Sequence, residues 1–373
     1  ANGSKIILVG DTEQLAPVDA GRPFEDLQKA HGALELSEVR RQKDHADREI
    51  GRAIREGRTE DAVTSMKARG QWHVGQRIGD VRAAMVNAYA DRRAGGQDAI
   101  MGAKRNTDVR ALNAAARTAL RERGFLRGPD VEVKTQHGNK AFATGDRVLF
   151  CVNDRITGTK NGTIGEVEAI NARRMVVRLG ERERLTLRLD AAERLPKAKA
   201  KEAELTAKLA ELRAAGKAAF EDRQHRSKAP ERVAKEIAER EARTRKIGKL
   251  SNELKAATQD RRSLQGESKA LVNLTHGHAI TVHKEQGETS RANGPIADRP
   301  ELGNGGDALM LGRGGESRQL AYVGVTRNEG KVHVFVCQKD EEKVIEAFGM
   351  RQEKESVNDY EVKDSPDPER SPK

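Results

Sequence analysis

Two stretches of the chain place polar and basic side chains directly after an apolar, β-branched run. They are VNLTHGHAITVHKEQGETS, Val272–Ser290, and LAYVGVTRNEGKVHVFV, Leu320–Val336. Such a run is typical of a buried parallel strand, which presents functional side chains at its carboxyl end. One strand is expected to contain Ala279, Ile280 and Val282, and the other Tyr322, Val323 and Val325. The side chains at the exits are Thr281, His283, Lys284 and Gln286 in the first stretch, and Thr326 and Arg327 in the second.

Arginine and amide side chains near the start of the chain suit the chemistry of phosphate groups. Arg40 and Arg41 are adjacent in Leu36–Gln42. A guanidinium is a planar, permanently charged fork that stabilises negative charge on phosphate oxygens. Gln14 follows an apolar run, and its neutral amide both donates and accepts hydrogen bonds. Taken alone, a pair of arginines is more often a solvated surface and a glutamine an ordinary turn residue, so the functional interpretation depends on the order of the motifs.

The order of four segments resembles one family. TVHKEQGET resembles motif V and YVGVTRNEGKVHVF resembles motif VI of the RecD-like branch of superfamily 1 DNA helicases. ILVGDTEQLAPVDAG, Ile7–Gly21, resembles motif III, and LSEVRRQ resembles the arginine-bearing motif IV. The resemblance is strongest to the helicase halves of conjugative relaxases of the TraA/TraI type. It covers about residues 5–170 and 270–337 and leaves the segment between them unexplained.

The resemblance implies roles for the residues at matching positions. Gln14 would couple the nucleotide state to the DNA contact, while Arg41 and Arg327 would be arginine fingers, with Arg40 as the alternative to Arg41. The implied nucleotide-binding set is Gly10, Asp11, Gln14, Arg40, Arg41, Gln286, Gly287 and Arg327. The candidate DNA-binding set is Asn106, Thr107, Lys160, Asn161, Thr281, His283, Lys284 and Thr326. No metal ligand is assigned.

The phosphate-binding loop of such a motor does not occur in this sequence. The family requires a GxxxxGK(S/T) loop for the phosphates and an acidic pair for magnesium. The stretches GTKNGTIGE and GKAAF have glycines and a lysine in the wrong arrangement, and no acidic pair precedes Asp11. We therefore expect the chain to be truncated and inactive alone, with ATP and Mg²⁺ bound in the intact protein.

Composition favours a polyanionic partner. The 373 residues carry a net charge of +11, with 34% charged and 3% aromatic residues. Nucleic acid is the first interpretation and an anionic membrane surface the second. No apolar run approaches the roughly 20 residues needed to span a bilayer, and the first residues form no secretory signal. Cys151 and Cys337 lie far apart in apolar runs, so we expect a cytoplasmic protein with two core thiols.

Periodicity predicts the elements that must position these side chains. Strands are expected at Lys5–Val9 and Trp72–Val74, and helices at Asp44–Arg69, interrupted at Gly57, and at Val81–Arg92. Ala99–Gly124 is expected to give a strand and then a helix capped by Asp108, with Asn113 and Arg117 on its surface. Short β-type runs over residues 128–190 indicate a small barrel. Leu195–Leu264 predicts two helices of about 30 residues, separated at Pro230, and Ser290–Ser317 an irregular loop.

The predicted fold class is α/β: the second RecA-like domain of a P-loop helicase, with an inserted SH3-like small β-barrel and a long helical hairpin. The predicted domains are the end of the first RecA-like domain (1–35), the second RecA-like domain (36–127 and 269–346), the SH3-like insertion (128–194), the charged hairpin (195–268) and a disordered tail (347–373). We expect the deletion of Lys197–Leu264 to leave the rest folded, because both ends of the hairpin must return to one place.

The predicted function is the carboxyl-terminal part of an ATP-dependent single-stranded DNA translocase, the motor of a plasmid conjugative-transfer relaxase. Single-stranded DNA is the expected partner, and the hairpin is a candidate contact for conjugation or relaxosome proteins. Two alternatives remain open at this point. One is a non-catalytic DNA-binding module derived from a helicase, and the other is a coiled-coil interaction scaffold.

Overall fold

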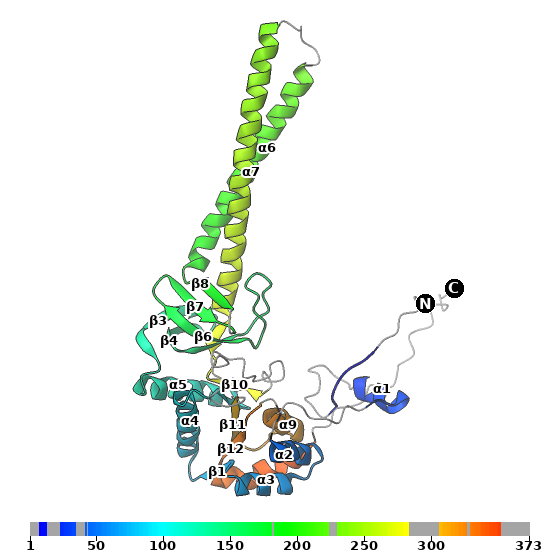
Figure 1. The fold of residues 1–373 in the computed structure, drawn as a ribbon, viewed down its shortest axis with the longest axis vertical. Coiled ribbons are helices and arrows are strands. Elements are labelled where there is room, and N and C mark those ends of the chain that lie inside the picture. The colour runs from blue at the N-terminus through cyan, green and yellow to red at the C-terminus, as the bar shows by residue number, and fades with distance from the viewer. Residues whose placement is uncertain are drawn as a thin grey trace, which may run out of the picture. The chain divides into compact units, whose positions relative to one another are not determined.

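The computed structural model describes residues 7–12, 23–34, 42, 44–180, 183–223, 230–282, 306–326 and 329–351 (Figure 1). The chain forms two compact units. The first combines Ala1–Leu126 with Gly277–Lys373, and the second is the intervening segment Arg127–His276. The second unit is therefore an insertion in the chain of the first.

A parallel sheet organises the first unit. Its strand order is β1 (Trp72–Gly75), β12 (Val332–Cys337), β11 (Asp307–Gly312), β2 (Ala99–Ala103) and β10 (Ala279–Thr281). Every neighbouring pair is parallel, so all five strands end at the same edge of the sheet. The strands are almost continuously apolar because helices cover both faces. This confirms the predicted α/β class and the predicted strand at Trp72–Val74.

Two sets of helices cover the sheet. One face packs against α4 (Ile78–Ala94) and α5 (Asn106–Glu122). The other face packs against α2 (His45–Arg55), α3 (Thr59–Ala68), α9 (Arg318–Thr326) and α10 (Glu341–Gly349). Figure 1 shows these two groups on opposite sides of the strands, while α1 (Pro23–His31) precedes them and η2 (Gln338–Asp340) precedes α10. The helices predicted between residues 44 and 124 are thus present.

The core on the α2 side follows strand alternation. Ala308 and Met310 of β11 and Val334 and Val336 of β12 point into one cluster with helix residues such as Ile54. The break between α2 and α3 falls at Gly57, whose φ of +80° is a left-handed conformation that glycine adopts without strain. Asp44 caps α2 by accepting hydrogen bonds from the backbone N–H groups of Ala46 and Asp47.

Three expectations for the first unit are wrong. Tyr322, Val323 and Val325 lie in helix α9 rather than in a strand. Six of the nine residues of this short helix are buried and none is exposed, so its apolar run cannot be told from a strand by periodicity. Ser290–Ser317 was expected to be irregular, yet β11 within it is the central strand of the sheet. Residues 7–9 of the strand expected at Lys5–Val9 form no regular element, and their apolar side chains are exposed rather than paired in a sheet.

The second unit contains the predicted β-rich segment. A hairpin of β3 (Arg127–Thr135) and β4 (Gly138–Thr144) accompanies an antiparallel sheet in the order β8 (Arg184–Arg188), β7 (Arg174–Arg178), β6 (Ile164–Ile170), β5 (Arg147–Phe150) and β9 (Leu274–His276). The side chains of Phe142, Phe150 and Met175 are fully buried between them. This confirms an antiparallel sheet within the insertion.

A long helical hairpin, the arm, projects from this sheet (Figure 1). It consists of α6 (Ala191–Arg223) and α7 (Pro230–Val272), so the predicted hairpin is confirmed. Leu205, Leu209 and Ala257 are buried along its seam. Leu264, however, is 1% exposed and belongs to the core of the β-sheet region. Deleting Lys197–Leu264 would remove this core residue. The prediction that the rest of the chain stays folded can therefore hold only for a shorter deletion that leaves the base of the arm in place.

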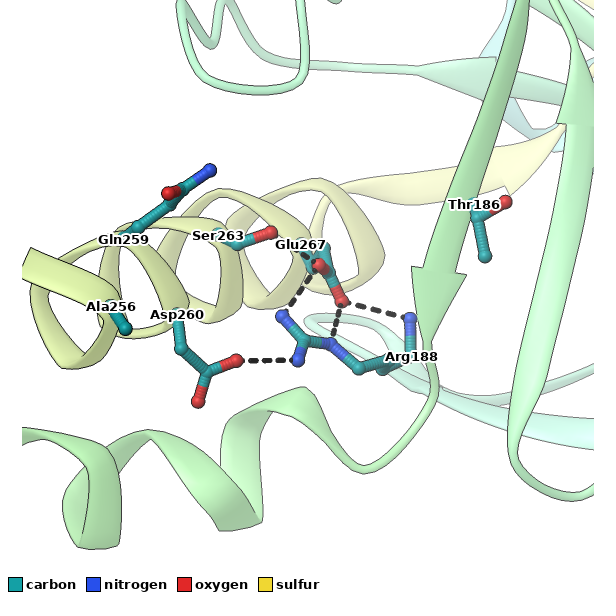
Figure 2. A pocket seen from close by; sticks show the side chains of 7 residues that line it. All are labelled: Thr186, Arg188, Ala256, Gln259, Asp260, Ser263 and Glu267. Atoms are coloured by element: carbon teal, nitrogen blue, oxygen red, sulfur yellow. Dashed lines mark hydrogen bonds and ion pairs between the residues drawn. The ribbon is translucent and has the colours of Figure 1, made fainter. Parts of the chain in front are cut away.

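The base of the arm is fixed by an ion-pair cluster (Figure 2). Arg188 of β8 donates from Nε and Nη2 to the two carboxylate oxygens of Glu267, at 2.8 and 2.9 Å, and from Nη1 to Asp260 at 2.7 Å. Ser263 also donates to Glu267, at 2.8 Å. The hydrogen bond with Glu267 raises the pKa of Arg188 against the opposing effect of burial. These contacts join β8 to two successive turns of α7.

Candidate nucleotide and nucleic-acid interface

Three of the predicted DNA-binding residues come together where β2 and β10 end. The parallel register pairs Thr281 with Ala103, the last residue of β2. Asn106 and Thr107 follow three and four residues later as the exposed first residues of α5. In open α/β sheets, ligands bind in the crevice outside the carboxyl ends of the strands. Asn106, Thr107 and Thr281 therefore share one candidate site, which we call the strand-end edge.

Basic groups surround the strand-end edge. Lys104 and Arg105 are exposed between β2 and α5, and Arg105, at the N-cap position, makes no side-chain cap to the helix. The first backbone N–H groups of α5 and these two cations point to an environment that favours anions. Lys104 also donates to the carbonyl oxygen of Gly315 in the loop that follows β11. The exits of β2 and β11 are thus directly connected.

Asp108 does not cap α5 as expected. It lies in the first turn of α5, and its side chain is 2% exposed. Its carboxylate forms ion pairs with Arg82 of α4 and with Arg313, which follows β11, the latter at 3.4 Å. Arg313 also lies 3.9 Å from Asp340. Two guanidinium groups thus converge on one buried carboxylate. The cluster, which balances two guanidinium groups against the carboxylates of Asp108 and Asp340, fixes the loops behind the strand-end edge.

Asn113 holds strand β10 in place. Its Oδ1 accepts hydrogen bonds from the backbone N–H groups of His278 and Ala279, both at 3.0 Å. Its Nδ2 donates to the carbonyl oxygens of Ala279, at 2.8 Å, and Val109, at 2.9 Å. β10 pairs only with β2 in the described part of the chain, so Asn113 supplies the hydrogen bonds that a further strand would make. The prediction that Asn113 lies on the surface is wrong.

A second buried contact supports the same strand. The hydroxyl of Tyr89 lies 3.0 Å from Nδ1 of His278, and both side chains are fully buried. Sequence reasoning missed this pair and Asn113. A strand of only three residues with a buried start requires such support, but no periodicity in the sequence indicates which side chains provide it.

The proposed arginine fingers flank two residues that both pack on α2. Arg40, Arg41 and Arg327 themselves lie outside the described residues. Gln42 is 2% exposed, and its carbonyl oxygen accepts a hydrogen bond of 2.9 Å from Arg48 of α2.

Thr326 meets the same helix at its next turn. A Cβ atom added at Gly51 of α2 would lie 3.2 Å from the methyl group of Thr326. The contact points at Arg48 and Gly51 are three residues apart, which places them on neighbouring positions of one helix face. Gln42 and Thr326, which adjoin Arg41 and Arg327 in the sequence, therefore both contact α2, Gln42 through the guanidinium of Arg48 and Thr326 at Gly51.

Thr326 is not brought to the strand-end edge. Its hydroxyl donates to the carbonyl oxygen of Tyr322 at 2.6 Å. Helix α9 returns from the end of β11 towards the start of β12, so Thr326 lies towards the opposite end of the strands from Thr281. Asn106, Thr107 and Thr281 therefore lie apart from Thr326 in the first unit, although all four belong to the predicted DNA-binding set.

The remaining nucleotide-binding positions are only partly described. Gly10 packs closely against Phe24 of α1, because an added Cβ would lie 3.0 Å from its ring. Asp11 follows Gly10 outside any regular element. Gln14, Gln286 and Gly287, like His283 and Lys284 of the DNA-binding set, lie outside the described residues. Within the described ranges, no group of three residues forms a metal site.

Lys160 and Asn161 are exposed on an ordered loop of the second unit. Asp154 accepts hydrogen bonds from the backbone N–H groups of Ile156 and Thr157 at 3.0 and 2.8 Å. Burial opposes ionisation of Asp154, but these hydrogen bonds outweigh it and lower its pKa. The N–H of Asn161 donates to Asn153 at 2.8 Å, which fixes the loop backbone.

The same loop is docked on α7. Lys269 donates to the carbonyl oxygen of Asn153 at 2.8 Å. Ile156 lies so close to Gly266 that an added Cβ would be only 2.8 Å from it. The basic loop that carries Lys160 is therefore held by the base of the arm.

Comparisons with known proteins agree with the family suggested by the motifs. A family model described as an AAA domain matches residues 1–77. The chain is 24% identical over 362 residues to a probable conjugal transfer protein TraA of Sinorhizobium fredii, covering 96% of this chain and 24% of that protein. It is 32% identical over 183 residues to the conjugal transfer protein TraA of Rhizobium radiobacter, covering 48% of this chain and 16% of that protein. The predicted resemblance to TraA-type proteins is confirmed, and the chain spans about a quarter of the first relative's length.

Solved structures of Bacteroides Pif1 are also similar. The structure of Pif1 bound to ssDNA has a TM-score of 0.44 and 14% identity, covering 89% of this chain and 62% of that one. Pif1 in complex with ADP-AlF3 and ssDNA has a TM-score of 0.39 and 14% identity, covering 88% and 60%. No described helix of the present chain is long and apolar enough to cross a membrane.

Proposed function

We propose that this chain, a homologue of conjugal transfer TraA proteins, is part of an ATP-dependent translocase that moves along single-stranded DNA during conjugative transfer. The first unit would be the second RecA-like domain of the motor. The sheet-containing part of the second unit would be an SH3-like insertion, from which the arm projects. The observation that carries the proposal is the common anchoring of Gln42 and Thr326 on α2.

The contacts of Gln42 and Thr326 with α2 support a nucleotide site because they hold the neighbours of both arginines on one helix. Arg41 and Arg327 each adjoin an anchored residue, so both would extend from neighbouring places on one helix towards the γ-phosphate. Arg40 is the alternative to Arg41. Gly10, Asp11 and Gln14 would approach the nucleotide from the preceding segment, and Gln286 and Gly287 would lie between nucleotide and DNA.

The strand-end edge would bind the DNA strand. Asn106 and Thr107 offer an amide, a hydroxyl and helix N–H groups to a phosphate, and Thr281 adds a second hydroxyl. His283 and Lys284 follow Thr281 by two and three residues and would extend this contact. Lys160 and Asn161 would contact the strand from the docked loop of the insertion.

ATP would be held jointly with a part of the protein that this sequence does not include. The arginine-bearing segments fit the phosphate end of a nucleotide, because guanidinium groups stabilise its negative charge. The phosphate-binding loop, and with it the ligands of Mg²⁺, would come from elsewhere in the longer protein, because the sequence has no GxxxxGK(S/T) loop. A phosphate-binding loop in the upstream reading frame would distinguish a motor from a non-catalytic DNA-binding module.

The test compares ATP hydrolysis by the intact protein with and without single-stranded DNA. Arg41→Ala or Arg327→Ala should reduce both rates, by about 10³ to 10⁵ if the side chain acts as an arginine finger. Nucleotide binding should change much less, because the charge on the phosphate is greatest in the transition state. His283→Ala should reduce mainly the DNA-stimulated rate.

Arg58→Ala is the matched control. Arg58 forms ion pairs with Glu56 and Asp61 on the surface of the first unit, so its loss should have little effect. If Arg41→Ala, Arg327→Ala and His283→Ala all reduce the basal and stimulated rates alike, the separate roles assigned to them are wrong.

A further inference from the structure

We propose that Arg313 is a positioning residue through which DNA bound at the strand-end edge regulates ATP hydrolysis. Arg313 lies between β11 and α9, the helix that ends at Thr326, one residue before the proposed arginine finger Arg327. It belongs to neither the predicted DNA-binding set nor the predicted nucleotide-binding set. The assignment rests on the proposed function, because it names the route by which DNA acts on the nucleotide site.

The loop that leads into α9 is joined to the first turn of α5. Nη1 of Arg313 lies 3.4 Å from Oδ1 of Asp108, which directly follows the proposed DNA contact Thr107. Lys104, which precedes α5, donates to the carbonyl oxygen of Gly315 in the same loop. Two polar contacts thus connect this loop to the segment that carries the DNA contacts.

Arg313 also contacts the helix layer on the other face of the sheet. Its backbone N–H donates to Glu316 at 3.0 Å, and Glu316 is 2% exposed in the loop that leads into α9. Its Nε lies 3.9 Å from a carboxylate oxygen of Asp340, the residue before α10, and α10 packs on α9. One guanidinium therefore connects α5 on one face with α9 and α10 on the other, around the carboxyl end of β11 (Figure 1).

Helix α9 reaches from this loop to the contact with α2. It is about 12 Å long between its first and last Cα atoms, at 1.5 Å per residue. Six of its nine residues are buried and none is exposed, so it is packed along its whole length. Its last residue, Thr326, approaches Gly51 of α2 closely. Because close-packed elements transmit a displacement, a shift at the start of α9 reaches the residue before Arg327.

Removal of Arg313 leaves the buried carboxylate of Asp108 with a partner. Asp108 also forms an ion pair with Arg82 of α4. A buried charge without any partner strongly destabilises a fold, and the pair with Arg82 prevents this. The side chain of Arg313 is itself 20% exposed, so water can replace part of it. The contact can therefore be removed without unfolding the first unit.

The first experiment measures ATP hydrolysis by the intact protein without DNA and at saturating single-stranded DNA. In Arg313→Gln the ratio of the two kcat values should fall by between about two- and thirty-fold, the range expected for altered coupling between sites. The basal kcat and the KM for ATP should keep their wild-type values, because Arg313 is assigned to neither ligand. Arg313→Lys retains the charge and should restore part of the stimulation.

Arg110→Gln is the matched control. Arg110 is an exposed arginine of α5, and its loss should leave the stimulation unchanged. A double-mutant cycle tests the contact itself, because Arg313→Gln should add no further loss of stimulation to Asp108→Asn. Trp72 fluorescence in guanidinium chloride checks the folding of each variant. Losses that multiply in the double variant, or equal stimulation in Arg313→Gln and Arg110→Gln, would overturn the proposal.

A second experiment uses this chain alone and needs no ATP hydrolysis. Backbone hydrogen exchange is compared with and without a strand of oligo(dT). The DNA should slow exchange in the first turn of α5 in both the wild type and Arg313→Gln. In α9 it should slow exchange in the wild type only. A wild-type α9 that does not respond to the strand contradicts the role of Arg313.

The outcomes separate this inference from the proposed function. A wild-type intact protein that does not hydrolyse ATP refutes the proposed function and this inference together. A wild-type rate that DNA stimulates, with the same stimulation in Arg313→Gln, refutes the role of Arg313 alone.

Discussion

Single side chains determine where the short strand β10 lies. Asn113 satisfies three backbone groups of His278 and Ala279 that a parallel neighbour would otherwise satisfy. Thr281 ends this strand, and His283 and Lys284 follow it. The polar residues predicted from the sequence as contacts therefore depend on an asparagine that was predicted to be a surface residue.

Asn113→Leu should destabilise the first unit. It leaves buried N–H and C=O groups without partners, at about 1–3 kcal/mol each, so the loss should be on the order of 3 kcal/mol or more. Trp72, the only tryptophan, is buried in β1 of this unit, and its fluorescence reports unfolding in guanidinium chloride. Thr118→Leu, at an exposed position of the same helix, is the control and should change the midpoint little. An unchanged midpoint for Asn113→Leu would contradict the role assigned here.

A partly buried histidine, His333, makes the first unit sensitive to acid. Burial, followed by the charge of Arg92, lowers the pKa of His333 from 6.5 to about 4, against the opposing effect of Asp307. His73 stacks on His333 and Lys331 lies nearby, so protonation would add charge to an already cationic group. The unfolded state therefore binds the proton more readily between pH 6.5 and 4.

The stability of the first unit should fall as the pH decreases from 6.5 towards 4. At about 1.4 kcal/mol per pKa unit, the His333 contribution is on the order of 3 kcal/mol. The midpoint of unfolding in guanidinium chloride, followed by Trp72 fluorescence at several pH values, measures this loss of stability. In His333→Asn the decrease should be smaller, whereas His31→Gln, at an exposed position, should retain it. An identical pH dependence in His333→Asn would show that other groups are responsible.

At the scale of elements, the inner part of the arm packs on the core of the β-sheet, whereas the outer part does not. Leu264 and Leu271 of α7 are buried among the strands, and Arg188 joins β8 to Asp260 and Glu267. The described residues of the outer arm, 210–223 and 230–249, have no such contact. The arm is therefore part of the sheet-containing core at its base and separable from it further out.

Replacing residues 210–249 by a short glycine-serine loop should leave the second unit folded. Leu205, Leu209 and the Glu202–Arg261 ion pair remain in this variant. Deletion of Lys197–Leu264 should instead expose the core, because it removes Leu264 and Asp260. Hydrogen exchange of β5 and β6 distinguishes the two variants. Equal protection in both would mean that the base of α7 does not stabilise the strands.

Long, amphipathic elements were predictable from the sequence, and short buried ones were not. α2 to α5 show three- and four-residue apolar spacing because one face meets solvent. β11 is buried except at its first residue and α9 has no exposed residue, so neither shows a period. The contacts of Asp108 and Asn113 join residues about 200 and 165 positions apart, which no local pattern encodes.

At the scale of the whole molecule, the motor that we propose would need a phosphate-binding loop from outside this sequence. No phosphate-binding loop occurs in it. The purified chain should therefore show no ATP hydrolysis above background, with or without single-stranded DNA. Phosphate release by this chain that DNA stimulates would contradict this expectation and require another nucleotide site.

The firm base of α7 gives the arm the mechanics of a lever. Residues 260–269 cover about 13 Å of α7. Within this segment, Glu267 binds Arg188 of β8, while Gly266 and Lys269 contact the basic loop. Arg243 lies about 32 Å from the middle of this segment, further out along the same helix. Because this distance is between two and three times the length of the fixed segment, a sideways force at Arg243 produces a force about two to three times larger at the contacts of residues 260–269. A load on the outer arm would therefore act on Asn153 and Ile156, and through them on the loop that carries Lys160.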